Sequence, residues 1–156
     1  MPEWTKNWFS NMLPFDEPVV HEGITYLAPE NFYQAQKFSE PGLKEFIASL
    51  SPWKAKTEAR KHKSQIRSDW NDAERIKWMR HVIDLKFTAE SSWGKKLLDT
   101  GDEEIIEWNN WGDDFFGKII ETQEGKNHLG NILMQRRNGL RLWIMLDGFE
   151  HPMHKI

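Results

Sequence analysis

Apolar residues recur along much of the chain at the three- and four-residue spacing that is typical of amphipathic helices. A first helix is expected over residues 29–38, because Pro29 suits the first helical position and a Ser-Glu-Pro-Gly break follows at 39–42. A second helix is expected around residues 43–50. Its apolar face consists of Leu43, Phe46, Ile47 and Leu50.

Further helices follow from capping residues and the same spacing. Ser51 followed by Pro52 predicts the start of a helix that ends near residue 61. Asp69 or Asn71 is expected to cap the longest helix, which ends near residue 87, and a short helix covers 92–98. The buried face of the longest helix is expected to contain Ile76, Met79, Val82, Ile83 and Phe87.

The C-terminal part of the chain predicts a long loop and one more helix. Residues 109–126 are polar, aromatic and punctuated by glycine, and ordered loops of this length are often functional. Asn127 is expected to cap the last helix. The inward-facing residues of that helix are Leu129, Ile132, Leu133 and Leu140.

Extended structure is confined to short regions. A turn at Glu22-Gly23 is expected to join two short strands within residues 19–27, and residues 105–108 are expected to form another strand. No repeat, low-complexity linker or composition break divides the chain. The sequence therefore predicts one compact domain over residues 1–156 that is mainly α-helical with a small β element.

The composition excludes several classes of protein. The chain of 156 residues has no cysteine, so disulfides, thiolate catalysis and cysteine-based zinc sites are excluded. No apolar run is long enough to span a membrane, and residues 1–4 do not start a secretory signal. The formal net charge of −3 argues against a non-specific nucleic-acid binder. We therefore expect a cytoplasmic protein that does not associate with membranes.

The chain is rich in large aromatic residues, with nine tryptophans and nine phenylalanines. A dense core explains part of this number, because aromatic side chains bury much surface per residue. Trp70, Trp108 and Trp111, however, stand beside polar residues rather than in apolar stripes. Aromatics in that setting often stack on a flat ligand, and the sequence leaves both interpretations open for them.

Glu30 lies in the first turn of the expected helix over 29–38. Free backbone N–H groups and the positive end of the helix dipole favour an ionised carboxylate at this place. A base, or a group that stabilises a cation, needs such a carboxylate. A first-turn acid can also serve only to stabilise its helix, and the local pattern leaves both roles open.

Several polar and aromatic motifs follow one another along the chain. They begin with Phe9-Ser10-Asn11 and with Glu30 ahead of Tyr33-Gln34-Ala35-Gln36-Lys37. Later motifs are Arg67 with Asp69-Trp70, the pair Lys86-Phe87, Leu98 with Thr100-Gly101-Asp102 and Glu107, Asp113 with Phe115 and Gly117, and Gly125, Asn127, Leu129-Gly130, Leu133-Met134 and Arg137. In this order and spacing, over roughly residues 8–140, the chain resembles the NADAR family, also called YbiA-like proteins.

The resemblance implies a single-domain YbiA-like fold and hydrolysis of an N-glycosidic bond. Members of the family are N-glycosidases, some of which act on a ribosylaminopyrimidine phosphate of riboflavin synthesis and others on ADP-ribose attached to guanine. The family name reflects predicted roles in NAD and ADP-ribose metabolism. The expected substrate is a ribosylated or ADP-ribosylated small molecule, or ADP-ribosylated nucleic acid.

Two carboxylates of the matched motifs suit this chemistry. Breaking the bond between C1′ and nitrogen builds positive charge on the ribose ring, which a nearby carboxylate stabilises. A carboxylate can also orient or deprotonate the attacking water. Glu30 and Asp113 are the candidates for these roles, and the sequence leaves open which residue takes which. The structural alternative for Asp113 is a turn-forming acid.

Other residues are expected to bind the substrate. Aromatic faces for the planar base come from Trp70, Trp111 and Phe116. Guanidinium groups for phosphate come from Arg67 and Arg75, and partners for ribose hydroxyls from Asn11, Gln34 and Asn127. The matched motifs add Phe9, Tyr33 and Lys86. Structural alternatives are a core position for Trp70, a solvated helix charge for Arg75, helix capping for Asn127 and a helix C-terminal charge for Lys86.

Two positions depart from the family pattern. Asn31 stands where the family has histidine after the helix-start glutamate, and it cannot carry a proton as histidine does. Phe116 stands where the family has tryptophan, and it keeps a stacking face but lacks the indole N–H donor. Both changes put substrate specificity in question more than the class of reaction.

Two other functions use the same features. A non-catalytic module that binds ADP-ribose or NAD needs the aromatics and arginines but not two acids, and an interaction module needs neither. The presence of both Glu30 and Asp113 favours the enzyme.

No metal-ligand cluster or phosphate-binding glycine loop is visible, so no metal or cofactor is expected. The oligomeric state is open. A basic stretch, expected to be a solvated helix face, contains Lys54, Lys56, Arg60, Lys61 and Lys63.

Overall fold

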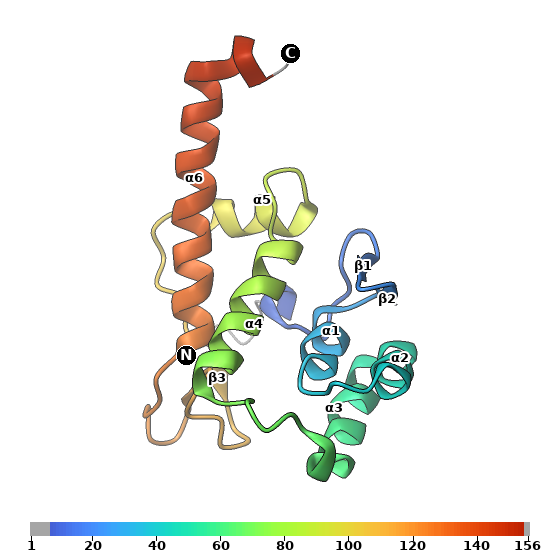
Figure 1. The fold of residues 1–156 in the computed structure, drawn as a ribbon. Helices are drawn as coiled ribbons and strands as arrows, with labels where there is room; N and C mark the ends of the chain where they lie inside the picture. Colours follow the sequence, from blue (N-terminus) through green and yellow to red (C-terminus); the bar gives the residue numbers. More distant parts are fainter. Residues whose placement is uncertain (1–6, 155–156) are drawn as a thin grey trace. The chain divides into compact units, whose positions relative to one another are not determined.

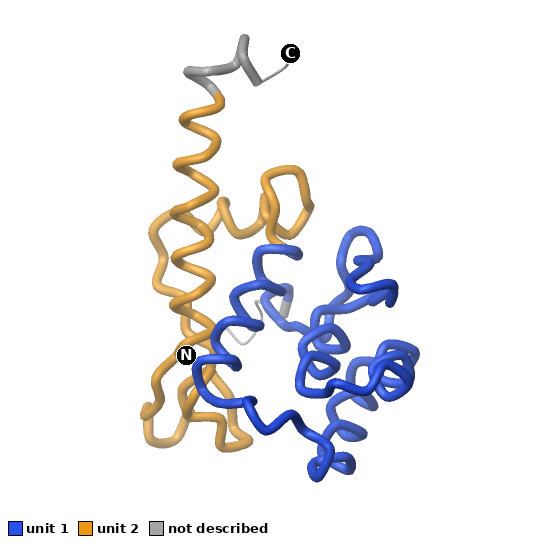
Figure 2. Tube along the Cα trace, viewed as in Figure 1, with its two compact units in different colours: residues 1, 3–86 blue, residues 2, 87–156 orange. Residues whose placement is uncertain are grey.

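The structure is a computed structural model that describes residues 7–154. Helices dominate it, and the strands form two small pairs (Figure 1). The prediction of a mainly α fold with a small β element is confirmed. Contacts within the chain define two compact units, one that ends at Lys86 and one that begins at Phe87 (Figure 2). A single domain over residues 1–156 stays a prediction.

Helix α1 is the central element of the first unit, where it contacts α2, α3, α4 and β2. Every residue of α1 is buried. The polar side chains of this short helix therefore need hydrogen-bond partners inside the protein. The elements of the unit are η1 (Asn7–Phe9), β1 (Val19–His21), β2 (Ile24–Tyr26), α1 (Pro29–Ala35), α2 (Pro41–Ser49), α3 (Pro52–Lys61), η2 (Lys63–Gln65) and α4 (Asp72–Lys86).

The predicted hairpin and the start of α3 are confirmed. β1 and β2 are antiparallel, with Val19 opposite Tyr26, and Glu22 and Gly23 form the turn with positive φ angles of 50° and 79°. At α3, the Ser51 hydroxyl accepts a hydrogen bond from the backbone N–H of Lys54. Both features depend on residues that are close in sequence, so the sequence alone could indicate them.

Two helix boundaries differ from the prediction. α1 ends at Ala35 rather than near residue 38, because the N–H groups that follow bond three residues back, as from Lys37 to Gln34, in tighter turns. α2 begins at Pro41, inside the predicted break, because the Glu40 side chain accepts hydrogen bonds from the next two free N–H groups. Phe46, which was expected to face inward, is exposed.

The second unit contains α5 (Ser92–Asp99), which packs on α6 (His128–His154), and a parallel pair of strands. These strands are β3 (Trp108–Asn109) and β4 (Lys118–Ile119). α6 has 27 residues and α4 has 15, so the prediction that the helix ending near residue 87 is the longest is wrong. The predicted inward face of the last helix is confirmed, since Leu129, Ile132, Leu133 and Leu140 are buried.

The expected strand over residues 105–108 is also largely wrong, because only its last residue belongs to β3. The Asn127 side chain takes the place of a partner strand: its oxygen accepts from the Glu107 N–H at 2.9 Å and its amide donates to the Ile105 carbonyl at 2.9 Å. These residues are 20 or more positions apart, so local pattern could not indicate the pairing.

Candidate active site

One face of α1 and the turn that follows it carries the residues on which the predicted chemistry depends. Glu30, Gln34 and Lys37 recur at helical spacing. The Gln34 amide donates a 2.7 Å hydrogen bond to Oε1 of Glu30. The backbone N–H of Glu30 donates to the carbonyl of Asn11 at 2.9 Å, which fixes the Phe9-Ser10-Asn11 motif against the start of the helix.

Burial governs the electrostatics of this face. Glu30 is only 8% exposed, and burial raises its pKa despite the Gln34 hydrogen bond and the nearby cations Lys56 and Lys37, which lower it. Burial therefore opposes the ionised form of Glu30 that the helix N-terminus was expected to favour. The Glu30 N–H is already bonded to a carbonyl, and the loss of water favours the neutral acid.

Lys37 is affected in the same way. Burial lowers its pKa to about 8, although the nearby Glu30 carboxyl raises it. The cations Arg75, Arg60 and Lys56 add to the lowering because like charges disfavour a further charge. Lys37 belongs to a matched motif but was not among the predicted site residues. Its position seven residues after Glu30 was the signal that could have identified it.

Two cations of α3 act on this same face. Lys56 and Arg60 both influence Glu30 and Lys37, and α3 packs directly on α1. The basic stretch is therefore not simply a solvated face. Lys54, Arg60, Lys61 and Lys63 are exposed, as expected for a solvated face, and only Lys56 is half-buried.

Two buried amide oxygens lie on the polar residues that flank Glu30. Oδ1 of Asn11 and Oε1 of Gln34 have no hydrogen-bond partner among the described residues. Both side chains are more than nine-tenths buried. A buried acceptor without a partner costs free energy, so a ligand that donates to these oxygens gains affinity.

Two aromatic residues, Tyr33 and Trp70, lie next to this face. Tyr33 is buried, and its ring centre is 5.8 Å from that of Trp70, which is half-buried. The Lys37 ammonium lies 5.6 Å from the Tyr33 ring centre, and the Arg67 guanidinium 5.4 Å from that of Trp70. Trp70 is thus neither a core residue nor fully solvated.

The remaining predicted residues of the first unit have clear structural contacts. Phe9 is buried, and Lys86, with 1% exposure, donates hydrogen bonds to the carbonyls of Trp8 and Ser10. Arg67 donates to the Gln36 carbonyl and to Asp69. Arg75 forms an ion pair with Asp72 at 3.0 Å, in agreement with a helix-surface charge.

Asn31 points to a different part of the first unit. Its amide donates to the carbonyls of Ile47 at 2.9 Å and Leu50 at 2.7 Å, at the end of α2. The residue is 2% exposed. The departure from histidine at this position therefore affects the contact between α1 and α2.

The second unit carries Asp113, in a loop that its own side chains organise. Oδ1 of Asp113 accepts hydrogen bonds from the N–H groups of Phe115 and Phe116. The Asn109 side chain, which is fully buried, donates to the Asp113 carbonyl and accepts from the Asp113 N–H. Asp113 therefore has the turn-forming contacts that were the structural alternative to a catalytic role. Its other carboxylate oxygen, Oδ2, has no hydrogen-bond partner within residues 7–154.

The other predicted residues of this unit differ in exposure. Trp111 is exposed, whereas Phe116 is buried against Phe115 at 4.8 Å between ring centres. Asn127 immediately precedes α6, as predicted, but its side chain bonds to Glu107 and Ile105 instead of to the helix. Because Glu30 and Asp113 belong to different units, a shared pocket for their carboxyl groups stays a prediction.

The described part of the chain shows neither a membrane span nor a metal centre. None of its helices is long and apolar enough to cross a bilayer. Nor does it contain three or more His, Cys, Asp or Glu side chains arranged to hold a metal ion.

Comparison with known proteins places the chain in a family. The NADAR domain model matches residues 2–141, and the chain therefore belongs to the NADAR family. It is 35% identical over 145 residues to an N-glycosidase of Nostoc punctiforme, a match that covers 90% of this chain and 89% of that protein. It is 30% identical to the N-glycosidase YbiA of Escherichia coli, over 86% of this chain and 81% of that protein. The chain is accordingly an N-glycosidase.

Two further similarities concern a solved structure and a longer relative. The solution NMR structure of Escherichia coli YbiA matches with a TM-score of 0.75 and 28% identity, covering 90% of this chain and 82% of that one. A riboflavin biosynthesis protein of Vibrio vulnificus is 31% identical over 90% of this chain but only 37% of its own length. The YbiA-like fold predicted from the motifs is thereby confirmed.

Proposed function

We propose that the chain hydrolyses the bond between C1′ of a phosphorylated ribose and the nitrogen of a base or amine. The two candidate substrates are a ribosylaminopyrimidine phosphate and ADP-ribose attached to guanine, either free or within nucleic acid. The observation that carries the proposal is the buried Glu30–Gln34 pair, with cations of α1 and α3 beside it. The relative named for riboflavin biosynthesis adds support for the first substrate.

In this proposal Glu30 is the general acid. Because burial raises its pKa, a larger fraction of Glu30 holds a proton near neutral pH than for an exposed glutamate. Cleavage of the C1′–N bond leaves an electron pair on nitrogen, and a proton from Glu30 neutralises it. Gln34 holds the Glu30 carboxyl in place through its 2.7 Å hydrogen bond.

Asp113 supplies the second carboxylate in the same proposal. One of its oxygens is held by two backbone N–H groups, which fixes its orientation. The other oxygen stabilises positive charge at C1′, or orients the attacking water and takes up its proton while the water oxygen forms the new bond to C1′. The proposal requires the two carboxyl groups to lie no more than about 10 Å apart, as in glycosidases. An experimental structure with a bound substrate analogue measures that distance directly.

The polar groups around Glu30 suit a phosphorylated sugar. The unpartnered oxygens of Asn11 and Gln34 can accept hydrogen bonds from ribose hydroxyls. Lys56 and Arg60 supply positive charge for a phosphate. Trp70 and Tyr33 offer aromatic faces next to them, on which a planar base can stack.

A substrate panel tests this function. The protein is incubated with a ribosylaminopyrimidine phosphate, ADP-ribosylated guanosine monophosphate, ADP-ribosylated DNA, NAD and ADP-ribose, and the released base and sugar are identified by mass spectrometry. We expect release from at least one of the first three. Calorimetric binding of ADP-ribose without release from any of them would contradict the proposal and favour a binding module.

The phosphate contact has its own test. Arg60→Gln should raise KM about tenfold or more for a phosphorylated substrate, as expected for the loss of a charge-assisted hydrogen bond, and should leave kcat nearly unchanged. Lys61→Gln is the matched control, because Lys61 is exposed on the same helix, as Arg60 is, but pairs with Glu58 and does not influence Glu30. Equal KM values for the two variants would show that Arg60 does not contact the phosphate.

A further inference from the structure

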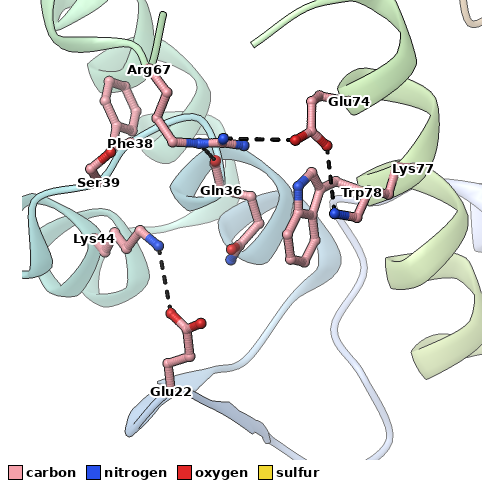
Figure 3. Close-up of a pocket in the computed structure, with 9 residues that line it drawn as sticks. All are labelled: Glu22, Gln36, Phe38, Ser39, Lys44, Arg67, Glu74, Lys77 and Trp78. Atoms are coloured by element: carbon pink, nitrogen blue, oxygen red, sulfur yellow. Dashed lines mark hydrogen bonds and ion pairs between the residues drawn. The ribbon is translucent and has the colours of Figure 1, made fainter. Parts of the chain in front are cut away.

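A polar cavity of about 240 Å³ lies in the first unit on another side of α1 (Figure 3). Gln36 lines it, and the Gln36 amide bonds to the carbonyl of Phe32. Phe32 and Gln36 each follow Glu30 and Gln34 by two positions, which corresponds to a rotation of about 200° around a helix. The cavity is therefore separate from the face that carries Glu30.

Hydrogen-bond donors without acceptors face this cavity. The Lys44 side chain is only 15% exposed, yet its nearest carboxylate, on Glu22, is 3.8 Å away. None of the described residues accepts a hydrogen bond from its ammonium group. The Trp78 indole nitrogen has no exposure to solvent and no partner among residues 7–154. Figure 3 shows Lys44 and Trp78 on opposite sides of the cavity.

Glu74 forms only long ion pairs at the cavity, whereas the Arg67 guanidinium is held by Asp69 at 2.7 Å. Glu74 lies 3.8 Å from Arg67 and 3.7 Å from Lys77, whereas charge-assisted hydrogen bonds measure about 2.7–2.9 Å. Three cations and two carboxylates line the space, and Asp69, which pairs with Arg67 at 2.7 Å, balances the third cation. The groups that lack acceptors are the Lys44 ammonium and the Trp78 indole N–H, so the missing ligand is an acceptor, and the charge of Lys44 favours an anionic one.

We propose that this cavity binds a phosphate group, either as inorganic phosphate or as a phosphate monoester, through Lys44 and the indole N–H of Trp78. A phosphate offers several acceptor oxygens, which match an ammonium and an indole donor at once. The volume leaves room for part of the molecule that carries the phosphate. This site is additional to the phosphate contact proposed for Lys56 and Arg60.

The Trp78 indole N–H gives a direct test. Its resonance in a ¹H–¹⁵N spectrum is assigned by Trp78→Phe, and the wild-type protein is titrated with inorganic phosphate and, separately, with ribose 5-phosphate, against sodium chloride of equal ionic strength. We expect a saturable shift with at least one phosphate compound and none with chloride. A response to inorganic phosphate alone assigns the site to the free anion. The absence of a response to both compounds overturns the proposal.

Variants separate this site from the one around Glu30. Lys44→Gln should weaken phosphate binding at least tenfold, Lys44→Arg should retain it because the charge is kept, and Lys61→Gln should leave it unchanged. Glu30→Gln and Arg60→Gln should also leave the Trp78 response unchanged. An unaltered affinity in Lys44→Gln, with a native far-UV spectrum, overturns the proposal. Loss of the response in Arg60→Gln assigns the phosphate to the Glu30 face and overturns it as well.

Discussion

The side-chain amide of Gln34 donates a 2.7 Å hydrogen bond to the carboxyl group of Glu30, one helical turn earlier on α1. Both side chains are more than nine-tenths buried. The bond fixes the carboxyl group where water contributes little to its solvation. The charge state of Glu30 should therefore affect the stability of the fold as well as the activity.

Glu30→Gln is expected to stabilise the fold near neutral pH. The raised pKa of Glu30 means that the folded protein holds this proton to a higher pH than the unfolded chain, so wild-type stability falls as pH rises above about 4.5. In the variant this loss of stability at higher pH does not occur, and the side-chain oxygen at position 30 still accepts the hydrogen bond from Gln34. Its Tm should exceed the wild-type value by a few degrees at pH 7, where 1 kcal/mol corresponds to about 2–4 °C.

The gain should disappear at acidic pH, because Glu30 is then neutral in both states. Thermal unfolding between pH 4 and pH 8 measures it. Glu45→Gln, at an exposed position on α2, is the control and should show no comparable gain. A Tm difference that does not change with pH would mean that burial of the charge is not its cause.

Lys37→Arg is expected to change the pH dependence of kcat/KM for a phosphorylated substrate. Lys37 carries a proton below its pKa of about 8 and loses it above that value, so its positive charge is available only on the acidic side. Wild-type kcat/KM should therefore fall as pH rises through about 8. In the variant the guanidinium stays charged, and the decline should move to higher pH. An identical decline in both proteins would exclude Lys37 as its source, and Lys54→Arg is the exposed control.

Two glycines of α6 form a matched pair for stability. A Cβ at Gly130 would overlap the Ile105 carbonyl oxygen and the Asn127 side chain, whereas a Cβ at Gly139 would meet nothing within 4 Å. Gly130→Ala should destabilise the protein by about 1–3 kcal/mol or more. Gly139→Ala should stabilise it by about 0.5–1 kcal/mol through helix propensity. Chemical denaturation of both variants checks the difference, and equal effects would refute the close approach at Gly130.

Phe116→Trp is expected to alter substrate choice. We propose that the loop from residue 108 to residue 116 forms the wall that contacts the base, and the variant restores an indole N–H that can bond to a base edge. Relative activity across the substrate panel should shift while the fold stays intact. Activities that all change by one factor would make Phe116 a packing residue, as its burial against Phe115 also allows. Phe46→Trp, at an exposed aromatic position, is the control.

Local features of the fold could be predicted from the sequence. The hairpin turn at Glu22-Gly23, the Ser51 cap and the Asn71 cap depend on residues at most three or four positions apart. The family motifs made the whole fold predictable, because their order and spacing span nearly the entire chain. They also identified Glu30 and Gln34, which the structure joins by a hydrogen bond.

Features that depend on distant residues could not be predicted. The pKa of Glu30 is set by the burial of α1 among three other helices, and a helix N-terminus in sequence does not show that burial. The influence of Lys56 and Arg60 on Glu30 depends on the packing of α3 against α1, which the sequence does not show. The parallel pairing of β3 with β4, and the bonds from Asn127 to residues 105 and 107, join segments that share no local pattern.

The turnover of Glu30→Gln tests the central claim most directly. The substitution keeps the shape of the side chain and its contact with Gln34 but removes the proton that the proposed mechanism delivers to the leaving nitrogen. Turnover is measured by mass-spectrometric release of the base from whichever panel substrate the wild-type protein cleaves. We predict a fall in kcat of about 10²–10⁴-fold with KM nearly unchanged and a native fold. A kcat close to the wild-type value would contradict the account and move the catalytic role to another residue, with Asp113 as the first candidate.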